Sequence, residues 1–451
     1  MAGRRTRSGG GRAGAGAGGR DRDRLPLVRA ALRTAASRYG TPLYLTEEAA
    51  IAAAAEELGS AFPDPWLRQY SVKANDVPAV IALVTGNGRG LGANVVSRGE
   101  WAAARAAGVP NDRITLEGIG KTDADLQAAV RAAVEGNPIR WLAVESADEA
   151  TVLGRLAARA GLGGDTRPRL DVLFRLNPDV TPETHAGLAV GAGGSKFGMT
   201  ETELSAAVEM VAGSQGGLRA RGIHLHVGSQ LGAVDAWRDA VRRGLALLAL
   251  LGGTLPDFDT LDLGGGFPVP PFGEPGPRPE RFARELPGLL ETIPADRRPA
   301  RLAIEPGRFL VARAGWLVGR VLHVRDRAER QVILDTGMTE LIRPALYGGH
   351  HAIVALTSLG RPVDDEPVRR EGPATEELVD VHGPICESTD ALGAHPLPAL
   401  RRGDLVAIRD AGAYGASLSS RYNGRPRPPQ VVLRADGQIV LARRRGPLAP
   451  G

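Results

Sequence analysis

The stretch RQYSVKA (residues 68–74) is β-rich, contains a lysine and begins the pattern that decides the fold. Similar runs follow it along the chain, and Ala/Leu-rich segments with helical spacing separate them. The eight predicted strands are RQYSVKA (68–74), LGANVVS (91–97), RITLEG (113–118), RWLAVES (140–146), LDVLFRLN (170–177), GIHLHVGS (222–229), TLDLGGG (260–266) and RLAIEPG (301–307). Eight strands that alternate with helices over roughly 260 residues predict an α/β fold of the (β/α)8 TIM-barrel type, which typically has about 250 residues. A doubly wound open sheet is the competing architecture, but no G-x-G-x-x-G motif follows the first strand.

Conspicuous polar groups follow seven of the eight predicted strands. In a (β/α)8 barrel, chemistry takes place where the strands end and the loops to the helices begin. The sequence therefore predicts a functional site at this end of the barrel, formed by Lys73-Ala-Asn75, Ser97-Arg-Gly-Glu100, Glu145-Ser146, Asn177-Pro-Asp179, His226-Val-Gly-Ser229, Gly264-Gly-Gly266 and Glu305-Pro-Gly-Arg308.

Lys73 is one of only three lysines in a chain with 56 basic residues. Arginine serves as the cation almost everywhere else, so a lysine at a strand end suggests chemistry that arginine cannot perform. Lysine can lose its proton at accessible pH and attack a carbonyl as an amine. A solvated lysine without a role is the alternative. We interpret Lys121 as a solvated cation and Lys196 as a residue that anchors a loop.

The positive charge of the chain belongs to its N-terminal tail. The net charge is +5, and residues 1–24 carry seven Arg and two Asp, so the remaining chain balances 49 basic against 49 acidic residues. The folded part therefore has no excess charge for a nucleic-acid backbone, and we expect no nucleic-acid partner. The Gly/Ala/Arg-rich tail has almost no large apolar residues and is predicted to be disordered. An Arg-rich transit peptide is the minor alternative for this tail.

The cysteine content and the lengths of the apolar runs limit where in the cell the protein is expected to be. The single cysteine, Cys386, excludes an internal disulfide, which suits a reducing cytoplasm. No apolar run approaches the roughly 20 residues needed to cross a bilayer, so we expect no membrane partner. No Cys/His spacing is typical of a zinc site, and we expect no metal.

The residues around Lys73 offer what an amine needs for carbonyl chemistry. The triplet Gly264–Gly266 has backbone N–H groups that a phosphate could approach closely, although a plain tight turn is the alternative. His226 could lie flat on a planar ring, with a core histidine as the alternative, and Glu305 could pair with a ring nitrogen. A lysine amine, a phosphate cradle, a stacking imidazole and a carboxylate together indicate a pyridoxal phosphate site.

The sequence also resembles the diaminopimelate decarboxylases, within the barrel-fold pyridoxal-phosphate decarboxylases that include the ornithine and arginine enzymes. The resemblance rests on motifs in family order between residues 70 and 428, namely YSVKAN, FRLNPDVTPETHAG, GSKFGM, HLHVGSQ, LDLGGGFP, EPGRFLVARAG, DTGMTELIRPALY, GPICESTD and DAGAYGASLSSRYNGRPRP. It implies a lysine-forming decarboxylase with pyridoxal phosphate as cofactor. It also implies the alanine-racemase-like fold III architecture, in which a C-terminal β-domain follows the barrel.

The resemblance assigns roles to individual residues. Lys73 would form the internal aldimine, and Glu305 would keep the pyridine nitrogen protonated, which makes the ring a stronger electron sink. Cys386 would deliver a proton to the reacting carbon, from the partner subunit of a homodimer with shared sites; a small buried hydrophobe is its structural alternative. The remaining expected contacts are His226, Ser229, Gly264, Gly265, Gly266 and Tyr414 for the cofactor, and Arg308, Arg343, Tyr347, Glu387 and Tyr414 for the substrate.

The expected domains follow from the same resemblance. They are a disordered tail (1–24), an N-terminal segment that joins the β-domain (25–48), the cofactor-binding barrel (49–308) and the C-terminal β-domain (309–451). The last of these contains the β-rich runs WLVGRVLHV, RQVILD, DLVAIRD, QVVLRA and QIVLAR.

Two departures from the family pattern concern the substrate rather than the catalytic groups. Asn94 stands where the family usually has Asp, and the loop GGGFPVPPFGE is partly similar to the ornithine-type enzymes. Three hypotheses follow: decarboxylation of meso-diaminopimelate to lysine, decarboxylation of another and possibly carrier-bound amino acid, or a catalytically inactive binding homologue. An inactive homologue should have lost Lys73, Cys386 or a cofactor loop, and this chain has kept them all. Two arginines and Glu387 suit a substrate with a distal carboxylate and a distal ammonium, which favours diaminopimelate.

Overall fold

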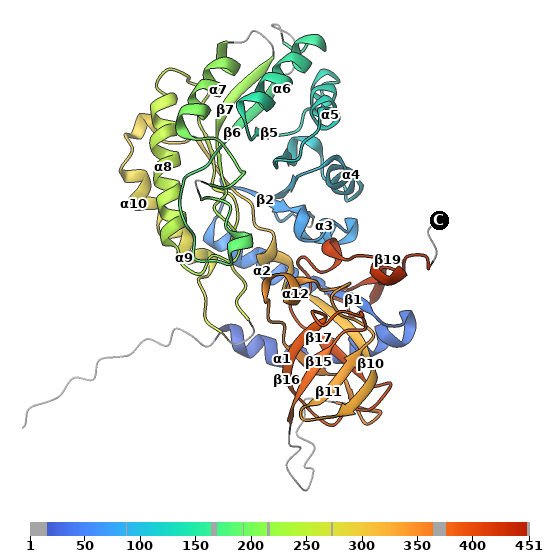
Figure 1. Ribbon diagram of the computed structural model, residues 1–451. Coiled ribbons are helices and arrows are strands. Elements are labelled where there is room, and N and C mark those ends of the chain that lie inside the picture. Colours follow the sequence, from blue (N-terminus) through green and yellow to red (C-terminus); the bar gives the residue numbers. More distant parts are fainter. Residues whose placement is uncertain are drawn as a thin grey trace, which may run out of the picture.

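The computed structural model describes residues 16–86, 88–163, 169–192, 194–213, 217–271, 274–363 and 376–448. Within these residues the chain forms a barrel and a separate β-sheet domain, which lie one above the other in Figure 1. No helix among them is both long enough and apolar enough to cross a membrane.

Eight parallel strands form the closed barrel, as the sequence predicts. Each strand pairs with the next along the chain, and the ring closes where Leu67 and Arg68 of the first strand pair with Ala303 and Ile304 of the last. The barrel strands are β2 (Leu67–Ser71), β3 (Leu91–Val95), β4 (Ile114–Leu116), β5 (Trp141–Val144), β6 (Leu170–Leu176), β7 (Leu218–Leu225), β8 (Thr260–Asp262) and β9 (Arg301–Ile304).

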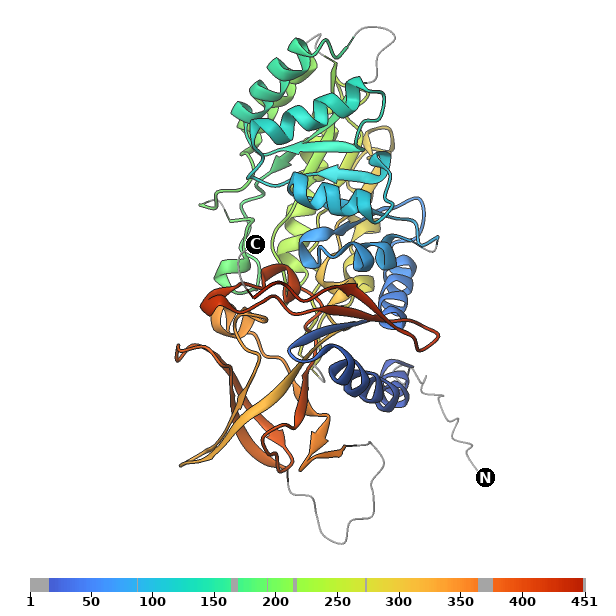
Figure 2. The same ribbon diagram turned by 90° about the vertical axis from the view of Figure 1, so that its right-hand side faces the viewer.

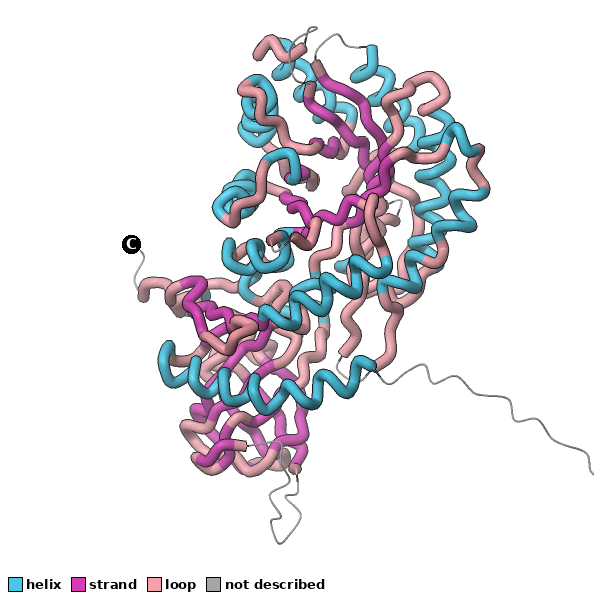
Figure 3. Tube along the Cα trace, turned by 180° about the vertical axis from the view of Figure 1, so that it is seen from behind, coloured by secondary structure: helices cyan, strands magenta, loops and turns pink. Residues whose placement is uncertain are grey.

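Helices surround the strands on the outside of the barrel, as the view from behind shows (Figure 3). Several of them begin at a residue that caps the helix: the side chains of Ser97, Thr122 and Ser146 accept N–H groups of the first turn. The helices of the barrel are α2 (Glu48–Ala61), α3 (Pro78–Thr85), α4 (Arg98–Ala106), α5 (Asp123–Val134), α6 (Ala147–Arg159), α7 (Glu201–Gly213), α8 (Asp235–Leu251), α9 (Pro279–Ala283), α10 (Leu286–Glu291) and α11 (Arg308–Val311).

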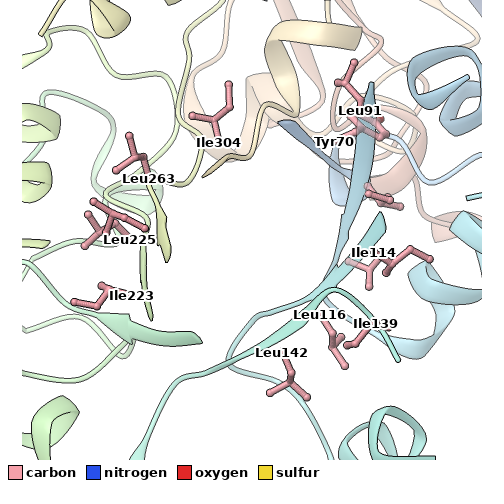
Figure 4. Packing of buried hydrophobic residues seen from close by; sticks show 14 of the residues in the cluster. Tyr70, Leu91, Ile114, Leu116, Ile139, Leu142, Ile223, Leu225, Leu263 and Ile304 are labelled. Carbon is pink, nitrogen blue, oxygen red and sulfur yellow. The ribbon is translucent and has the colours of Figure 1, made fainter. Parts of the chain in front are cut away.

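The largest hydrophobic core lies between the strands and these helices. Figure 4 shows members of this core on opposite sides of the ring, with Leu116 and Leu142 on one side and Ile223 and Leu225 on the other. These four side chains are almost completely buried. The barrel is therefore a rigid frame that holds the strand ends at fixed positions.

The second domain is built around a mixed sheet that takes in a strand from the N-terminal segment. β1 (Leu43–Glu47) pairs antiparallel with β10 (Gly315–Asp326) and parallel with β18 (Gln430–Leu433). Figure 2 shows this strand and α1 (Gly16–Tyr39) in dark blue beside the orange and red C-terminal strands. The other elements are β11 (Arg330–Leu334), α12 (Arg343–Tyr347), β12 (Ile353–Ala355), β13 (Thr357–Ser358), β14 (Arg361–Pro362), β15 (Glu377–His382), β16 (Ala391–Leu397), β17 (Leu405–Ile408) and β19 (Ile439–Arg443).

The N-terminal tail differs in part from its prediction. Residues 1–15 lie outside the described residues, whereas α1 begins at Gly16, inside the segment expected to be disordered. The helix continues to Tyr39, and its buried side chains Leu32 and Ala35 contact the β-domain core. This apolar anchor is the reason that the segment forms a helix despite the Gly/Arg-rich start.

Candidate active site

Lys73 lies in a 3-10 turn, Val72–Ala74, that directly follows β2. A loop of the β-domain holds this turn in place. The N–H of Tyr414 donates to the Ala74 carbonyl at 2.8 Å, and Asn75 Nδ2 donates to the Gly412 carbonyl at 3.0 Å. The half-buried Lys73 side chain is therefore positioned by both domains.

His226 follows β7 and contacts the glycine triplet. Its Nδ1 atom accepts the N–H of Gly265 at 3.2 Å, which fixes the ring orientation and leaves the ring proton on Nε2. Burial and the nearby charge of Lys73 lower the pKa of His226 well below its usual value. The imidazole is therefore neutral, as a ring that stacks on a planar cofactor should be.

The triplet Gly264–Gly266 adopts a turn that only glycine fits. Gly264 and Gly266 have φ angles of +66° and +103°, and a Cβ atom at Gly265 would collide with the Glu305 carbonyl. Two of the three N–H groups already have acceptors, because Gly264 donates to Asp262 Oδ1 at 2.9 Å and Gly265 donates to His226. The N–H groups of Gly266 and of the residue after it are therefore the ones that remain available for a phosphate.

Glu305 follows β9 and is buried, with 3% of its surface exposed. Its Oε1 atom accepts Asn94 Nδ2 from β3 at 2.8 Å. Asn94, which departs from the family pattern, therefore directly contacts Glu305, the predicted partner of the ring nitrogen. An amide at this position donates a hydrogen bond to Glu305 that an ionised carboxylate could not.

Three buried residues beneath Glu305 were missed by the sequence analysis. They are Glu117 at the end of β4, His224 in β7 and Asp262 in β8. His224 Nε2 lies 3.3 Å from Glu117 Oε2 and 3.6 Å from Glu305 Oε2. A sequence signal existed for His224, because it stands two positions before His226 on the same strand run and so shares its face.

Burial governs the pKa values of these residues. It raises the pKa of Glu117 to about 8, with the Glu305 carboxylate as the next cause. It raises the pKa of Asp262 well above the usual range and lowers that of His224 to about 4. At neutral pH the imidazole of His224 is thus uncharged.

A pocket of about 250 Å³ lies at the mouth of the barrel, between the barrel loops and the β-domain. Arg308, Arg343 and Tyr347 line it, as the sequence predicts for a substrate site, together with His185, Gln230 and other residues. Arg308 and Arg343 are buried, and neither guanidinium forms a salt bridge within the described residues. Burial and the neighbouring Arg343 lower the pKa of Arg308 to about 10, so it stays charged.

The residues predicted to bind the phosphate and those predicted to bind the substrate come together at Arg308. Its Nη2 atom donates to Ser229 Oγ at 3.0 Å, and its guanidinium lies 4.6 Å from the centre of the Tyr414 ring. Arg343 lies 5.7 Å from the Tyr347 ring, and His185 contacts the same ring edge-on. One continuous region thus joins the cofactor contacts to the pocket.

Cys386 and Glu387 lie outside this pocket. Both are exposed in the loop between β15 and β16, where Asn423 Nδ2 lies 3.5 Å from Cys386 Sγ and Tyr422 donates to Glu387 Oε1 at 2.6 Å. Within one chain the thiol is exposed rather than buried as a small hydrophobe would be. Within one chain the structure therefore does not bring these two residues to the other predicted site residues.

The interpretation of Lys121 as a solvated cation is wrong. Its side chain is 0% exposed, pairs with Glu149 Oε1 at 3.1 Å and donates to the Gly118 carbonyl. The polar sequence around Lys121 suggested solvent exposure, but the ammonium group satisfies buried acceptors instead. Lys196 is exposed, with its Nζ atom 5.3 Å from the centre of the Phe197 ring.

The described residues fit pyridoxal phosphate. The turn at Gly264–Gly266 has no room for Cβ atoms, so its backbone carries no side chains, and the neutral His226 ring stands beside it. Lys73 provides an amine at the neighbouring strand end, and Glu305 provides an acceptor for a protonated ring nitrogen. The donor set matches a phosphorylated aromatic aldehyde.

Comparisons with known proteins agree with this geometry. Residues 48–312 match the family model for the pyridoxal binding domain of pyridoxal-dependent decarboxylases. The diaminopimelate decarboxylase of Aquifex aeolicus is 35% identical over 92% of this chain and 91% of its own length, and that of Vibrio cholerae is 34% identical over 91% of each. The structure is similar to diaminopimelate decarboxylase from Helicobacter pylori complexed with L-lysine, with a TM-score of 0.78, 30% identity and coverage of 90% of this chain and 95% of the other. By its motifs, its architecture and these relatives, the chain belongs to the diaminopimelate decarboxylases, within the pyridoxal-dependent decarboxylase family.

Proposed function

We propose that this protein decarboxylates meso-2,6-diaminopimelate to L-lysine and CO2 with pyridoxal phosphate as cofactor. One observation carries the choice of substrate: two buried guanidinium groups, Arg308 and Arg343, face the pocket without a carboxylate partner in the described chain. Buried cations without partners are costly, so a ligand carboxylate should complete the site.

Bound pyridoxal phosphate supplies an aldehyde and an electron-accepting ring. Lys73 provides the amine that holds the aldehyde, and neutral His226 supports the face of the ring. Ser229 and Gly266 would bind the phosphate, and Tyr414 would close this region from the β-domain. Glu305 orients the ring through its nitrogen and stabilises positive charge there.

The carboxylate that leaves must not be the one held by the arginines. Two guanidinium groups on the departing carboxylate would stabilise the ground state and slow the reaction. Arg308, Arg343 and Tyr347 therefore bind the distal carboxylate, where a guanidinium fork gives bidentate geometry. Glu387 suits the distal ammonium, and together these contacts require a diamino dicarboxylic acid.

We also propose a homodimer with shared active sites. Cys386 and Glu387 are exposed and lie away from the pocket of their own chain, so they are available to a pocket of the partner. Cys386 Sγ would deliver the proton that replaces the lost carboxyl group. A thiol in this role must stay reduced, which supports a cytoplasmic location.

The substrate is tested by measuring CO2 release from diaminopimelate, lysine, ornithine and arginine with the loaded enzyme. We expect turnover of diaminopimelate alone, because the other three lack the distal carboxylate and leave the arginines unpaired. Turnover of ornithine or of a carrier-bound acyl group at a comparable kcat/KM would contradict the proposed substrate while leaving decarboxylation intact.

The shared site is tested by subunit exchange between two inactive variants, Lys73→Ala and Cys386→Ala. In a mixed dimer, one of the two sites receives both intact residues, so part of the activity should return. A mixture of Lys73→Ala with itself is the control and should stay inactive. Verified exchange without recovery would show that each site is complete within one chain.

A further inference from the structure

A closely spaced group of acids lies inside the barrel, directly beneath Glu305. One donor atom each from Glu117, His224 and Glu305 lies within 4.8 Å of the others, and Asp262 adds a third carboxyl group from β8. All four side chains are at least 97% buried. Water therefore cannot screen their charges, and three ionised carboxylates could not coexist here.

The hydrogen bonds that reach this group are too few to compensate three negative charges. Trp141 Nε1 donates to Glu117 Oε1 at 3.4 Å, and Asn94 Nδ2 donates to Glu305 Oε1 at 2.8 Å. Asp262 Oδ1 accepts the N–H of Gly264, whereas its Oδ2 atom has no hydrogen-bond partner. These donors are neutral, so they support one anion rather than three.

The nearest cations are also insufficient. Besides burial, the charges of Arg175 and Lys73 lower the pKa of His224. Arg175, however, already pairs with Glu145 at 2.5 Å. His224 itself has no hydrogen bond at either ring nitrogen, and burial keeps it neutral. Protons on the acids themselves can supply the compensating positive charge.

We infer that Glu117 holds a proton beneath Glu305, donates its O–H to the Glu305 carboxylate, and thereby keeps Glu305 singly charged and correctly oriented. Glu117 is a positioning residue in this arrangement, because it acts through Glu305. The link from Glu305 to the cofactor ring rests on the proposed function, whereas the proton on Glu117 does not.

Two features favour Glu117 over its neighbours as the proton carrier. Glu305 accepts a hydrogen bond from Asn94, which stabilises its ionised form, and the amide of Asn94 cannot itself carry the charge. Glu117 has a long contact from Trp141 and lies 3.3 Å from Nε2 of the neutral His224 ring, and its pKa is raised to about 8 by burial and by Glu305. Asp262 is protonated for the same reason, but one of its oxygen atoms is already held by the glycine turn.

Infrared difference spectroscopy of the protein without cofactor tests the proton directly. At pH 7 the wild type should show a C=O stretching band of a protonated carboxylic acid that Glu117→Gln lacks. Asp262→Asn should remove a different band of this kind. Glu203→Gln is the control, because Glu203 is exposed, its pKa is lowered by hydrogen bonds from Thr200, and its loss should leave these bands unchanged.

A spectrum of Glu117→Gln identical to that of the wild type in this region would overturn the inference. So would a divalent cation that copurifies with the wild type in equimolar amount and is lost in Glu117→Gln. The glutamine is nearly isosteric and can still donate to Glu305, so misfolding should not obscure the result.

The loaded enzyme separates this inference from the proposed function. The absorbance of bound pyridoxal phosphate should change with pH around a midpoint near 8 in the wild type, and this change should be absent in Glu117→Gln. If the infrared band is lost as expected but the cofactor spectrum of the wild type does not depend on pH, the proton on Glu117 stands. The proposed contact of Glu305 with the ring is then wrong.

Discussion

The mouth of the barrel and its interior respond to burial in opposite ways. At the mouth, burial lowers the pKa of Arg308 to about 10, and the group remains charged at neutral pH. In the interior, burial raises the pKa of Glu117 to about 8, and the group becomes neutral. The difference lies in the unperturbed pKa values. That of arginine lies so far above neutral pH that a decrease leaves the group charged, whereas that of a carboxylic acid lies close enough to neutral pH for an increase to make the group neutral. The same physical effect thus leaves a positive charge at the mouth and favours protonated carboxyl groups in the interior.

Lys73 lies between these two regions, and its loss should have the largest effect. Burial is the main cause that lowers the pKa values of His226 and His224, and the charge of Lys73 adds to it in both. We expect Lys73→Ala to reduce kcat by at least about 10⁴-fold, the upper end for loss of a proton-transferring group. Lys196→Ala is the control, because Lys196 is exposed, and it should remain active.

Chemical labelling checks the same assignment without an activity measurement. Reduction of the loaded protein with borohydride should leave the cofactor covalently attached to the peptide that contains Lys73. Attachment at Lys121 or Lys196 would show that the wrong lysine has been assigned.

The mouth of the barrel is tested by Arg343→Ala. Removal of one partner of a buried charge contact costs about 2–5 kcal/mol, so kcat/KM for diaminopimelate should fall roughly 30- to several-thousand-fold, mainly through KM. The absorbance of the bound cofactor should not change. Arg325→Ala, on an exposed position of β10, should behave as the wild type. A fall in kcat with unchanged KM would mean that Arg343 acts on the reacting end of the substrate instead.

The interior is tested by Asn94→Asp, which adds a carboxyl group to the acids beneath Glu305. Burial and the neighbouring carboxylates should raise the folded-state pKa of the new group above its unfolded value of about 3.9. Stability is then close to that of the wild type below the unfolded pKa and is lost as pH rises through the folded pKa. Near pH 8 we expect a loss of about 3 kcal/mol, measured by urea unfolding of the protein without cofactor. A loss that is equal at all pH values would indicate that only the hydrogen bond to Glu305 matters.

The junction of the two regions is tested by a pair of glycine substitutions. Gly265→Ala directs a Cβ atom at the Glu305 carbonyl and should cost about 1–3 kcal/mol, with a shift in the cofactor spectrum. Gly288→Ala lies in α10 with open space around its Cβ and should stabilise the protein by about 0.5–1 kcal/mol. Equal effects of the two substitutions would show that the triplet is not tightly packed against β9.

Much of this arrangement could be predicted from the sequence because the barrel strands are short apolar runs with polar residues at their ends. Each predicted run overlaps an observed strand, although β2 and β7 begin before their runs, and the predicted pocket residues Arg308, Arg343 and Tyr347 line one cavity. In the β-domain the prediction missed β15 and β16, which alternate between exposed and buried positions and contain histidine and proline. Strands of this composition give a weak signal.

The interior acids could not be found in the same way. Glu117 follows an apolar run in the same manner as many surface residues, and only the closure of the barrel brings it to His224 and Glu305. The prediction that Lys121 is a solvated cation was wrong because a sequence shows the polarity of neighbouring residues but not the direction in which a side chain points. Cys386 lies away from the pocket of its own chain, and its proposed role requires a second chain, which no single sequence displays.

The hydrogen bonds between the Lys73 turn and the loop around Tyr414 have a consequence for protein synthesis. Asn75 and its acceptor Gly412 are 337 residues apart in the chain. At about 5–20 residues per second, the ribosome needs roughly 20–70 s to add the second partner after the first. Throughout that interval the nascent barrel has its lysine but not the backbone contacts that orient it. The enzyme therefore cannot hold its cofactor in final form until the ribosome has added the loop around Gly412.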